Sequence, residues 1–454
     1  MSKQRTTANR STEPILARGQ LSFVEHCLCP LHVNAVDSND HTHKFEYFYT
    51  DGAKNRRKAQ VRVRCPNGLS GTDEFFLWGL LGLTFRQAAP TFQFCATSHY
   101  CLKQLGCISS TSKGGKNYAQ FRQSLERLAS ATYQNDAFYD PVRCEHREVS
   151  FGILSYSLPI DADSSRAWRI VWDPLFFEFT QATSGHLSFD LDLYRRLDAG
   201  SRRLFLLLKK IFWRRRKSPT FDVRHLATNV LGYSRDLDTK TLKAKVKRCT
   251  QILIQHDIIK IPNDAGIGSL FDKRAKGTYS ICFHRGRYFD RPNRPSKPPG
   301  IIDSPLYDPL HAVGFDSRSI GRIVTSFKYR DIQMWTDVTL AALERKGRAF
   351  FRVSPEAFFM DNIQNAAQGR RTPPDWFLEI QKQENTTNSS SRRDGASDAQ
   401  LTRAINVKSA NNRTQHEQLV EEVFSRFRAV GQSEDKARHN AHRVARHSNV
   451  IIRK

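Results

Sequence analysis

The side chains best suited to bind a metal ion lie near the N-terminus. Residues 26–32 read His-Cys-Leu-Cys-Pro-Leu-His. Thiolate and imidazole are good zinc ligands, but zinc sites of this type usually add a second cysteine pair, which this segment lacks. Cys27 and Cys29 also lie two apart in an alternating run, residues 21–33, which predicts a strand that buries both thiols on one face. We therefore expect packing cysteines, and no metal site that includes His32.

A second pattern, His41-Thr42-His43, is similar to the paired histidines of metal-dependent enzymes that nick DNA. In those enzymes the intervening residue is hydrophobic, and the chemistry needs a buried metal-facing pair and a nucleophilic tyrosine on a helix. Here the intervening residue is Thr42, and the chain contains no P-loop motif. We therefore expect no catalysis and no cofactor. A nicking or strand-transfer enzyme remains a hypothesis beside those given below.

The net charge points to a polyanionic partner. Seventy-one Lys and Arg residues oppose 45 Asp and Glu residues, which gives a formal net charge of +26. Such an excess attracts nucleic acid or an anionic membrane. The longest apolar stretch, residues 75–85, is too short to span a bilayer, and the N-terminus lacks the apolar core of a secretory signal. We expect no membrane contact and a cytoplasmic location, where the nine cysteines stay reduced.

The densest basic segment lies in the middle of the chain. Eight Lys and Arg residues and no acid stand between Ser201 and Ser218, and a helix expected over residues 239–256 adds five more. The apolar stripe of that helix (Leu242, Val246, Cys249, Leu253) must face the core, so its polar side chains face outward. Asp238 or Thr239 can cap the helix, whose first amides could then also hold a phosphate. The residues expected to bind DNA are Lys240, Thr241, Lys243, Lys247, Arg248 and Gln251 on this helix, Lys273, Arg274 and Lys276 on the hairpin at residues 263–278, and Arg214, Arg215 and Arg216 at the end of the preceding helix.

The elements that position these residues occur in a repeated order, which is helix, strand, helix, helix, strand, strand. The first copy is expected to have a helix opened by Ser70 or Thr72, a strand at 92–94, helices at 97–105 and 118–133, and strands at 137–139, 147–159 and 166–179. The second is expected to have helices at 201–216, 224–231 and 239–256, and strands at 220–223, 258–262 and 277–283. Gly106 and Gly232 close the second helix of each copy.

This order predicts an α+β protein with two tandem winged-helix domains, a small helical C-terminal region and a disordered basic tail. In a winged helix the second helix of the helix-turn-helix enters the major groove. The long helix of the first copy carries mixed charge, so DNA contact and a homodimer interface both remain open for it. The expected parts are a mobile N-terminus (1–20), a first winged helix (21–190), a second winged helix that is the main DNA reader (191–290), a Pro-rich linker (291–309), a helical domain (310–382), and a linker with basic tail (383–454).

Several short motifs carry a family resemblance over about residues 20–290. The run Gly68–Glu74 before a hydrophobic helix resembles replication initiator protein A of bacterial plasmids. So do the motif Lys116-Asn117-Tyr118 followed by Leu125-Glu126-Arg127-Leu128-Ala129, and residues 201–262 with His225-Leu226-Ala227. The resemblance implies a bacterial cytoplasmic protein, associated with the nucleoid or a plasmid, that binds repeated double-stranded DNA at an origin. It also implies that the protein promotes melting and recruits the host replicative helicase with its loader. It also implies a homodimer that represses its own gene. The alternative is a winged-helix transcriptional regulator, including an autorepressor.

Overall fold

The computed structural model describes residues 16–31, 42–52, 54–108, 114–161, 164–183, 185–262, 266–290 and 304–384. All of these residues belong to one compact unit, and residues 386–454 lie outside the described residues. The expectations for His32, His41, most of the Pro-rich linker and nearly all of the basic tail therefore also lie outside them. The described residues form an α+β protein with several small antiparallel sheets.

The first copy of the repeated order comprises α1 (Gly71–Phe85), β4 (Gln93–Ala96), α2 (Ser98–Gln104), α3 (Gly115–Ser130), β7 (Leu154–Ser157) and β8 (Trp168–Trp172). Its three strands form one antiparallel sheet in the order β4-β8-β7. In this sheet the first strand of the copy, β4, pairs with its last, β8, and β8 pairs with the middle strand, β7. α1 starts where the sequence predicts, because Ser70 and Asp73 form a reciprocal capping box.

The second copy repeats this topology. It comprises α6 (Ala199–Phe212), β10 (Phe221–Asp222), α7 (Val223–His225, continued by a π-helical turn over Leu226–Val230), α8 (Thr239–Gln255), β12 (Phe271–Ala275) and β13 (Thr278–Ile281). The strand order is β10-β13-β12, so the first strand again pairs with the last. Gly106 and Gly232 have φ angles of +67° and +81°, which glycine adopts readily at the end of a helix.

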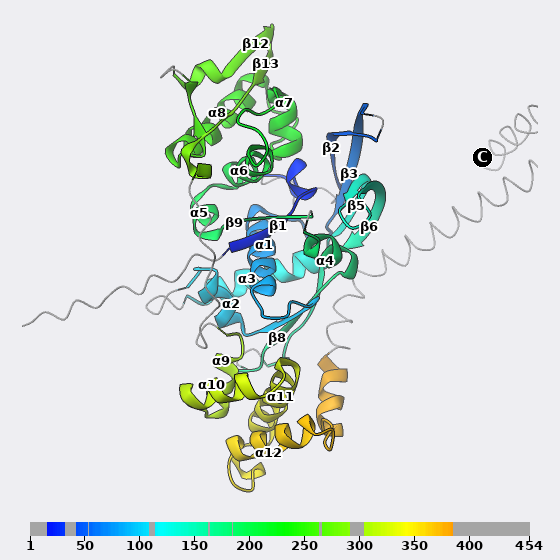
Figure 1. Cartoon of the computed structure of the whole chain (residues 1–454), viewed down its shortest axis with the longest axis vertical. Coiled ribbons are helices and arrows are strands. Elements are labelled where there is room, and N and C mark those ends of the chain that lie inside the picture. The colour runs from blue at the N-terminus through cyan, green and yellow to red at the C-terminus, as the bar shows by residue number, and fades with distance from the viewer. Residues whose placement is uncertain are drawn as a thin grey trace, which may run out of the picture. The chain divides into compact units, whose positions relative to one another are not determined.

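Further strands and short helices are present besides the two copies (Figure 1). A four-stranded antiparallel sheet has the order β2 (Thr42–Thr50), β3 (Arg56–Arg64), β5 (Thr132–Asp140) and β6 (Glu145–Gly152). β1 (Leu16–Gln20) pairs with β9 (His186–Asp190). The short helices α4 (Pro174–Gln181) and α5 (Leu191–Arg196) lead into the second copy. Because β5 and β6 follow α3 directly, the four-stranded sheet interrupts the first copy between its long helix and its hairpin.

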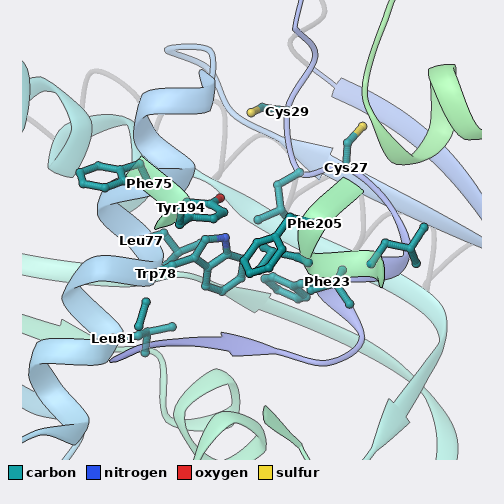
Figure 2. Packing of buried hydrophobic residues seen from close by; sticks show 14 of the residues in the cluster. Phe23, Cys27, Cys29, Phe75, Leu77, Trp78, Leu81, Tyr194 and Phe205 are labelled. Carbon is teal, nitrogen blue, oxygen red and sulfur yellow. The ribbon is translucent and has the colours of Figure 1, made fainter. Parts of the chain in front are cut away.

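A single hydrophobic core runs through both copies, from Ala17 to Phe283. Figure 2 shows its centre, where Trp78 of α1, Tyr194 of α5 and Phe205 of α6 come together, all fully buried. A second core belongs to α9 (Tyr307–Val313), α10 (Ser317–Ser326), α11 (Tyr329–Lys346), α12 (Pro355–Ala367) and a final helical stretch at residues 375–384. The two copies therefore share one interior, and the C-terminal helices have their own.

The strand predicted over residues 21–33 is wrong. Residues 16–20, expected to be mobile, form β1, and residues 23–25 form a 3-10 turn. Cys27 and Cys29 lie in an irregular segment held by the second copy, where Cys27 N–H donates to Asn229 O at 2.8 Å and Leu31 N–H donates to Gly232 O at 2.8 Å. The apolar alternation of this segment reflects burial between the copies and not the pleat of a sheet.

Other boundaries differ for local reasons. The strand predicted over 166–179 ends at Trp172, because Asp173 caps α4 and Pro174 occupies its first turn. The run predicted as one strand over 147–159 is split between β6 and β7, which belong to different sheets. The helix predicted to reach Tyr133 stops at Ser130, and α9 begins inside the stretch predicted as linker.

The predicted pairing of strands 258–262 and 277–283 is also wrong. β11 (Ile259–Lys260) pairs with β14 (His284–Arg285), and the basic hairpin consists of β12 and β13. Likewise, the helix predicted to reach Arg216 ends at Phe212, so Arg214–Arg216 follow α6 as a turn.

Candidate nucleic-acid interface

The basic helix α8 is the best-defined part of the candidate interface. Its apolar stripe of Leu242, Val246, Cys249 and Leu253 is fully buried, as the spacing predicts. Asp238 is the capping residue, and its Oδ1 accepts a hydrogen bond from Thr241 N–H at 3.1 Å. Hydrogen bonds from the Thr241 side chain and backbone lower the pKa of Asp238 below its usual value. A carboxylate therefore already occupies the positive end of the helix, where an anion would otherwise bind.

The face of α8 opposite the stripe is polar and open. Lys240, Lys247, Arg248 and Gln251 are exposed, while Thr241 and Lys243 are half-buried. Arg248 lies 3.9 Å from the carboxylate of Asp198 but keeps 78% of its side chain exposed, so this ion pair holds it weakly. The three residues Lys240, Lys247 and Gln251 follow one side of the helix over about 16 Å, given the rise of an α-helix.

Lys243 connects α8 to the hairpin of β12 and β13. Its Nζ lies 3.8 Å from the centroid of the Tyr279 ring and 5.3 Å from that of Phe271. Both rings come from the hairpin strands, one from each. A cation over aromatic faces is attracted by their quadrupoles, so Lys243 orients the hairpin against the helix.

The hairpin itself carries the other predicted cations. Lys273, Arg274 and Lys276 are all exposed, and Arg274 Nε donates to Ser280 Oγ at 3.0 Å across the strands. Gly277 has a φ angle of +76°, which lets the chain reverse directly after Lys276. The structure thus brings the predicted hairpin residues into one basic projection beside α8.

Arg224 is a positioning residue that the sequence does not reveal. Its guanidinium donates to the carbonyls of Arg235 at 3.2 Å and Leu237 at 3.3 Å, and to Thr239 Oγ1 at 3.4 Å. These groups form the turn between α7 and α8. Because two of the three acceptors are backbone oxygens, no residue type or spacing in the sequence identifies them.

Arg214, Arg215 and Arg216 belong to a different place. They are exposed in the turn after α6, where Arg216 O accepts from Arg285 N–H at 2.9 Å. β13 pairs with β10 at the end away from the Lys276–Gly277 turn. These arginines therefore lie beyond the far end of the hairpin strand, beside the exposed ring of Trp213.

In the first copy, the hairpin between β7 and β8 is bound by acidic side chains of the C-terminal helices. Arg166, which exposes 5% of its side chain, pairs with Asp337 at 2.8 Å and with Glu384 at 2.6 Å. Next to it, Ser164 Oγ donates to the Glu344 carboxylate at 2.9 Å. The hairpin between β7 and β8 is thus clamped onto the C-terminal helices. The cations of α3 are mixed with acids, as in the Arg122–Glu126 pair at 3.5 Å.

The cysteine segment lies in the interior. Burial raises the pKa of Cys29 to about 12, and Arg203 Nη2 lies 2.8 Å from its sulfur. Within the described residues, no group of three or more His, Cys, Asp or Glu side chains is arranged to hold a metal ion. His43 is part of β2, which belongs to the sheet that interrupts the first copy. No described helix is long and apolar enough to cross a membrane.

Comparisons with known proteins are sparse. No protein-family model matches the chain, and no curated protein matches it. Among solved structures, a crystal structure of domains 2 and 3 of RctB matches with a TM-score of 0.38 and 13% sequence identity, over 58% of this chain and 96% of that one. Similarity of this extent identifies no family.

Proposed function

We propose that this chain is a non-catalytic, sequence-specific binder of double-stranded DNA, built on two winged helices, whose second copy is the main reader. The observation that carries the proposal is the junction of α8 and the β12–β13 hairpin through Lys243. It places an exposed basic helix face beside an exposed basic hairpin on one side of the second copy. That pairing is what a recognition helix and a wing require.

The chemistry of α8 suits the major groove. The groove admits an α-helix, lysine can bind guanine O6 and N7, and glutamine can bind adenine N6 and N7. Lys240, Lys247 and Gln251 supply these groups along one face. Asp238 opposes a phosphate at the first turn, so we place phosphate contacts on the hairpin cations, chiefly Lys273 and Lys276.

The test of this proposal begins with duplexes that the protein itself selects from a random pool. Lys247→Ala and Gln251→Ala should each weaken binding by about 1–3 kcal/mol and relax the selected sequence if they contact bases. Lys276→Ala should weaken binding equally on all duplexes and lower the slope of log affinity against log salt by about 0.9. The matched control is Arg318→Ala/Arg322→Ala on the exposed face of α10. Binding that α8 variants leave intact would overturn the proposal.

Within this function we assign the protein to plasmid-type replication initiation, which rests on the motif resemblance at residues 68–74, 116–129 and 201–262. A plasmid whose only replication functions are this gene and its flanking DNA should then be maintained in a bacterial host. The same plasmid with the Lys247→Ala/Gln251→Ala change should be lost. If the selected sequences occur beside the gene but the plasmid does not replicate, the protein would instead be a transcriptional regulator.

A further inference from the structure

A second basic surface lies outside the candidate interface, on the outer face of β2 and β3. From Lys58 on, strand β3 alternates, with Ala59, Val61 and Val63 buried against the core. The opposite face of the same two strands carries five cations, which we call the basic sheet face: Lys44, Arg56, Lys58, Arg62 and Arg64. None of the residues that the sequence predicts to bind DNA lies on this face.

One cross-strand pair on this face is electrostatically unfavourable. Lys44 and Arg62 stand directly opposite each other in the β2–β3 register, and both are exposed. Like charges in this position destabilise a sheet. Lys58 is neutralised by Glu46 at 2.8 Å, but within the described residues neither Lys44 nor Arg62 forms an ion pair with an acid. An anion bound between the two side chains would remove the repulsion.

The basic sheet face adjoins the turn that leads into α8. β2 is the edge strand, and its backbone is held by the second copy: Arg235 Nη2 donates to Lys44 O at 3.1 Å, and Glu46 N–H donates to Asn229 Oδ1 at 3.1 Å. Arg235 stands three residues before Asp238, the cap of α8. Figure 1 shows β2 beside α7, and the rings of Phe48 and His225 are 5.4 Å apart. The position of Lys44 is thus fixed relative to the start of α8.

We propose that the basic sheet face binds the sugar–phosphate backbone of duplex DNA flanking the segment that α8 reads. This inference rests on the proposed function. Duplex DNA presents phosphates at regular, close spacing, which suits a row of cations on two adjacent strands. A single strand would need free aromatic faces for base stacking. The exposed ring on this face, Phe48, already has the Arg56 guanidinium over it at 4.2 Å and His225 beside it.

The test uses the full chain and two duplexes selected by the protein, one trimmed to the base pairs whose identity the selection holds constant and one with a helical turn of random sequence added at each end. Lys44→Gln/Arg62→Gln should lower affinity for the long duplex several-fold and reduce its salt slope by about 1.8, which is two phosphate contacts. Affinity for the trimmed duplex should hold. The control pair Arg318→Gln/Arg322→Gln removes the same charge from α10 and should change neither duplex.

Stability provides an independent readout, because the Lys44→Gln/Arg62→Gln change removes a like-charge pair. The variant should melt at the wild-type temperature or above, so weaker binding cannot be attributed to misfolding. If the Lys44→Gln/Arg62→Gln variant binds both duplexes with the affinity and salt slope of the wild type, the inference is overturned. RNA or an acidic protein would then be the partner of this face. Failure of the wild-type chain to bind any duplex would instead overturn the proposed function.

Discussion

Arg203 and Glu74 join the two copies inside the protein: Arg203 Nε donates to Glu74 Oε2 at 2.8 Å, and the side chains are only 3% and 8% exposed. Arg203 lies on α6 and Glu74 on α1, which are the first helices of their copies. The same guanidinium donates to Leu231 O at 2.7 Å. One buried cation therefore holds α1, α6 and the end of the helix that precedes α8. The Arg203–Glu74 pair therefore ties the two copies together within their shared core.

Removing the carboxylate should therefore unfold the protein more easily. Glu74→Gln leaves Arg203 buried without its counter-charge, and we expect a loss of about 3–5 kcal/mol in the free energy of unfolding. Denaturant titration measures it. Glu178→Gln is the matched control, because the Glu178 side chain is 44% exposed and lies 4.0 Å from Arg143; its cost should stay within about 0.5 kcal/mol. Equal costs for the two variants would contradict the role of the buried pair.

Lys243 and Lys247 should respond differently to the same substitution. Lys243→Met breaks the contact with Tyr279, and we expect it to couple with Tyr279→Leu by about 0.5–1 kcal/mol in a double-mutant cycle of unfolding. Lys247→Met, on the exposed face one turn further, should weaken DNA binding without changing stability. Additive effects of Lys243→Met and Tyr279→Leu would mean that the lysine does not orient the hairpin.

His26 should make stability depend on pH. Its Nδ1–H donates to Cys27 O at 3.1 Å and its Nε2 accepts from the Tyr133 hydroxyl at 2.9 Å, which requires a neutral ring. Burial lowers the pKa of His26 to about 4. The unfolded chain binds a proton at His26 more readily than the folded chain. The contribution of the neutral ring to the free energy of unfolding, about 3 kcal/mol, is therefore complete above about pH 6.5 and is lost as the pH falls through 4.

The His26 contribution can be isolated with one variant. Free energies of unfolding of the wild type and of His26→Gln, whose side chain can still accept from Tyr133, should converge as the pH falls from 6.5 to 4. Two parallel profiles over this interval would assign the acid sensitivity to other groups.

The clamp on the first copy should open when Arg166 is neutralised. Arg166→Gln leaves Asp337 and Glu384 facing each other without their cation, in a place where burial already raises the pKa of Asp337. Hydrogen exchange in β7, β8 and α11 should accelerate on the order of a hundredfold, as expected for about 3 kcal/mol. Arg169→Gln, at an exposed position of β8 three residues further along the chain, is the control. Unchanged exchange in Arg166→Gln would show that the ion pairs do not hold the hairpin.

Local patterns predicted much of the fold. The stripe of α8, the capping residues Ser70 and Asp238, and the glycines that end the second helix of each copy all depend on neighbours within about four residues. The predictions failed where long-range contacts overrode such patterns. Residues 21–31 alternate like a strand, but the second copy binds their backbone, and β11 found its partner in β14 instead of β13.

The amino-acid sequence by itself determined the net charge, the repeated order of elements and which face of α8 must be buried, because each depends on composition or on side chains close in the chain. Tertiary structure decided what each cation does. Arg203 meets Glu74 across 129 residues, and Arg166 meets Asp337 and Glu384 across 171 and 218. Lys243 turns onto a hairpin ring, and Lys44 and Arg62 face each other on one sheet. A lysine or arginine reads the same in sequence whether it is buried, stacked or open to DNA, since only the folded chain sets the distance to its counter-charge.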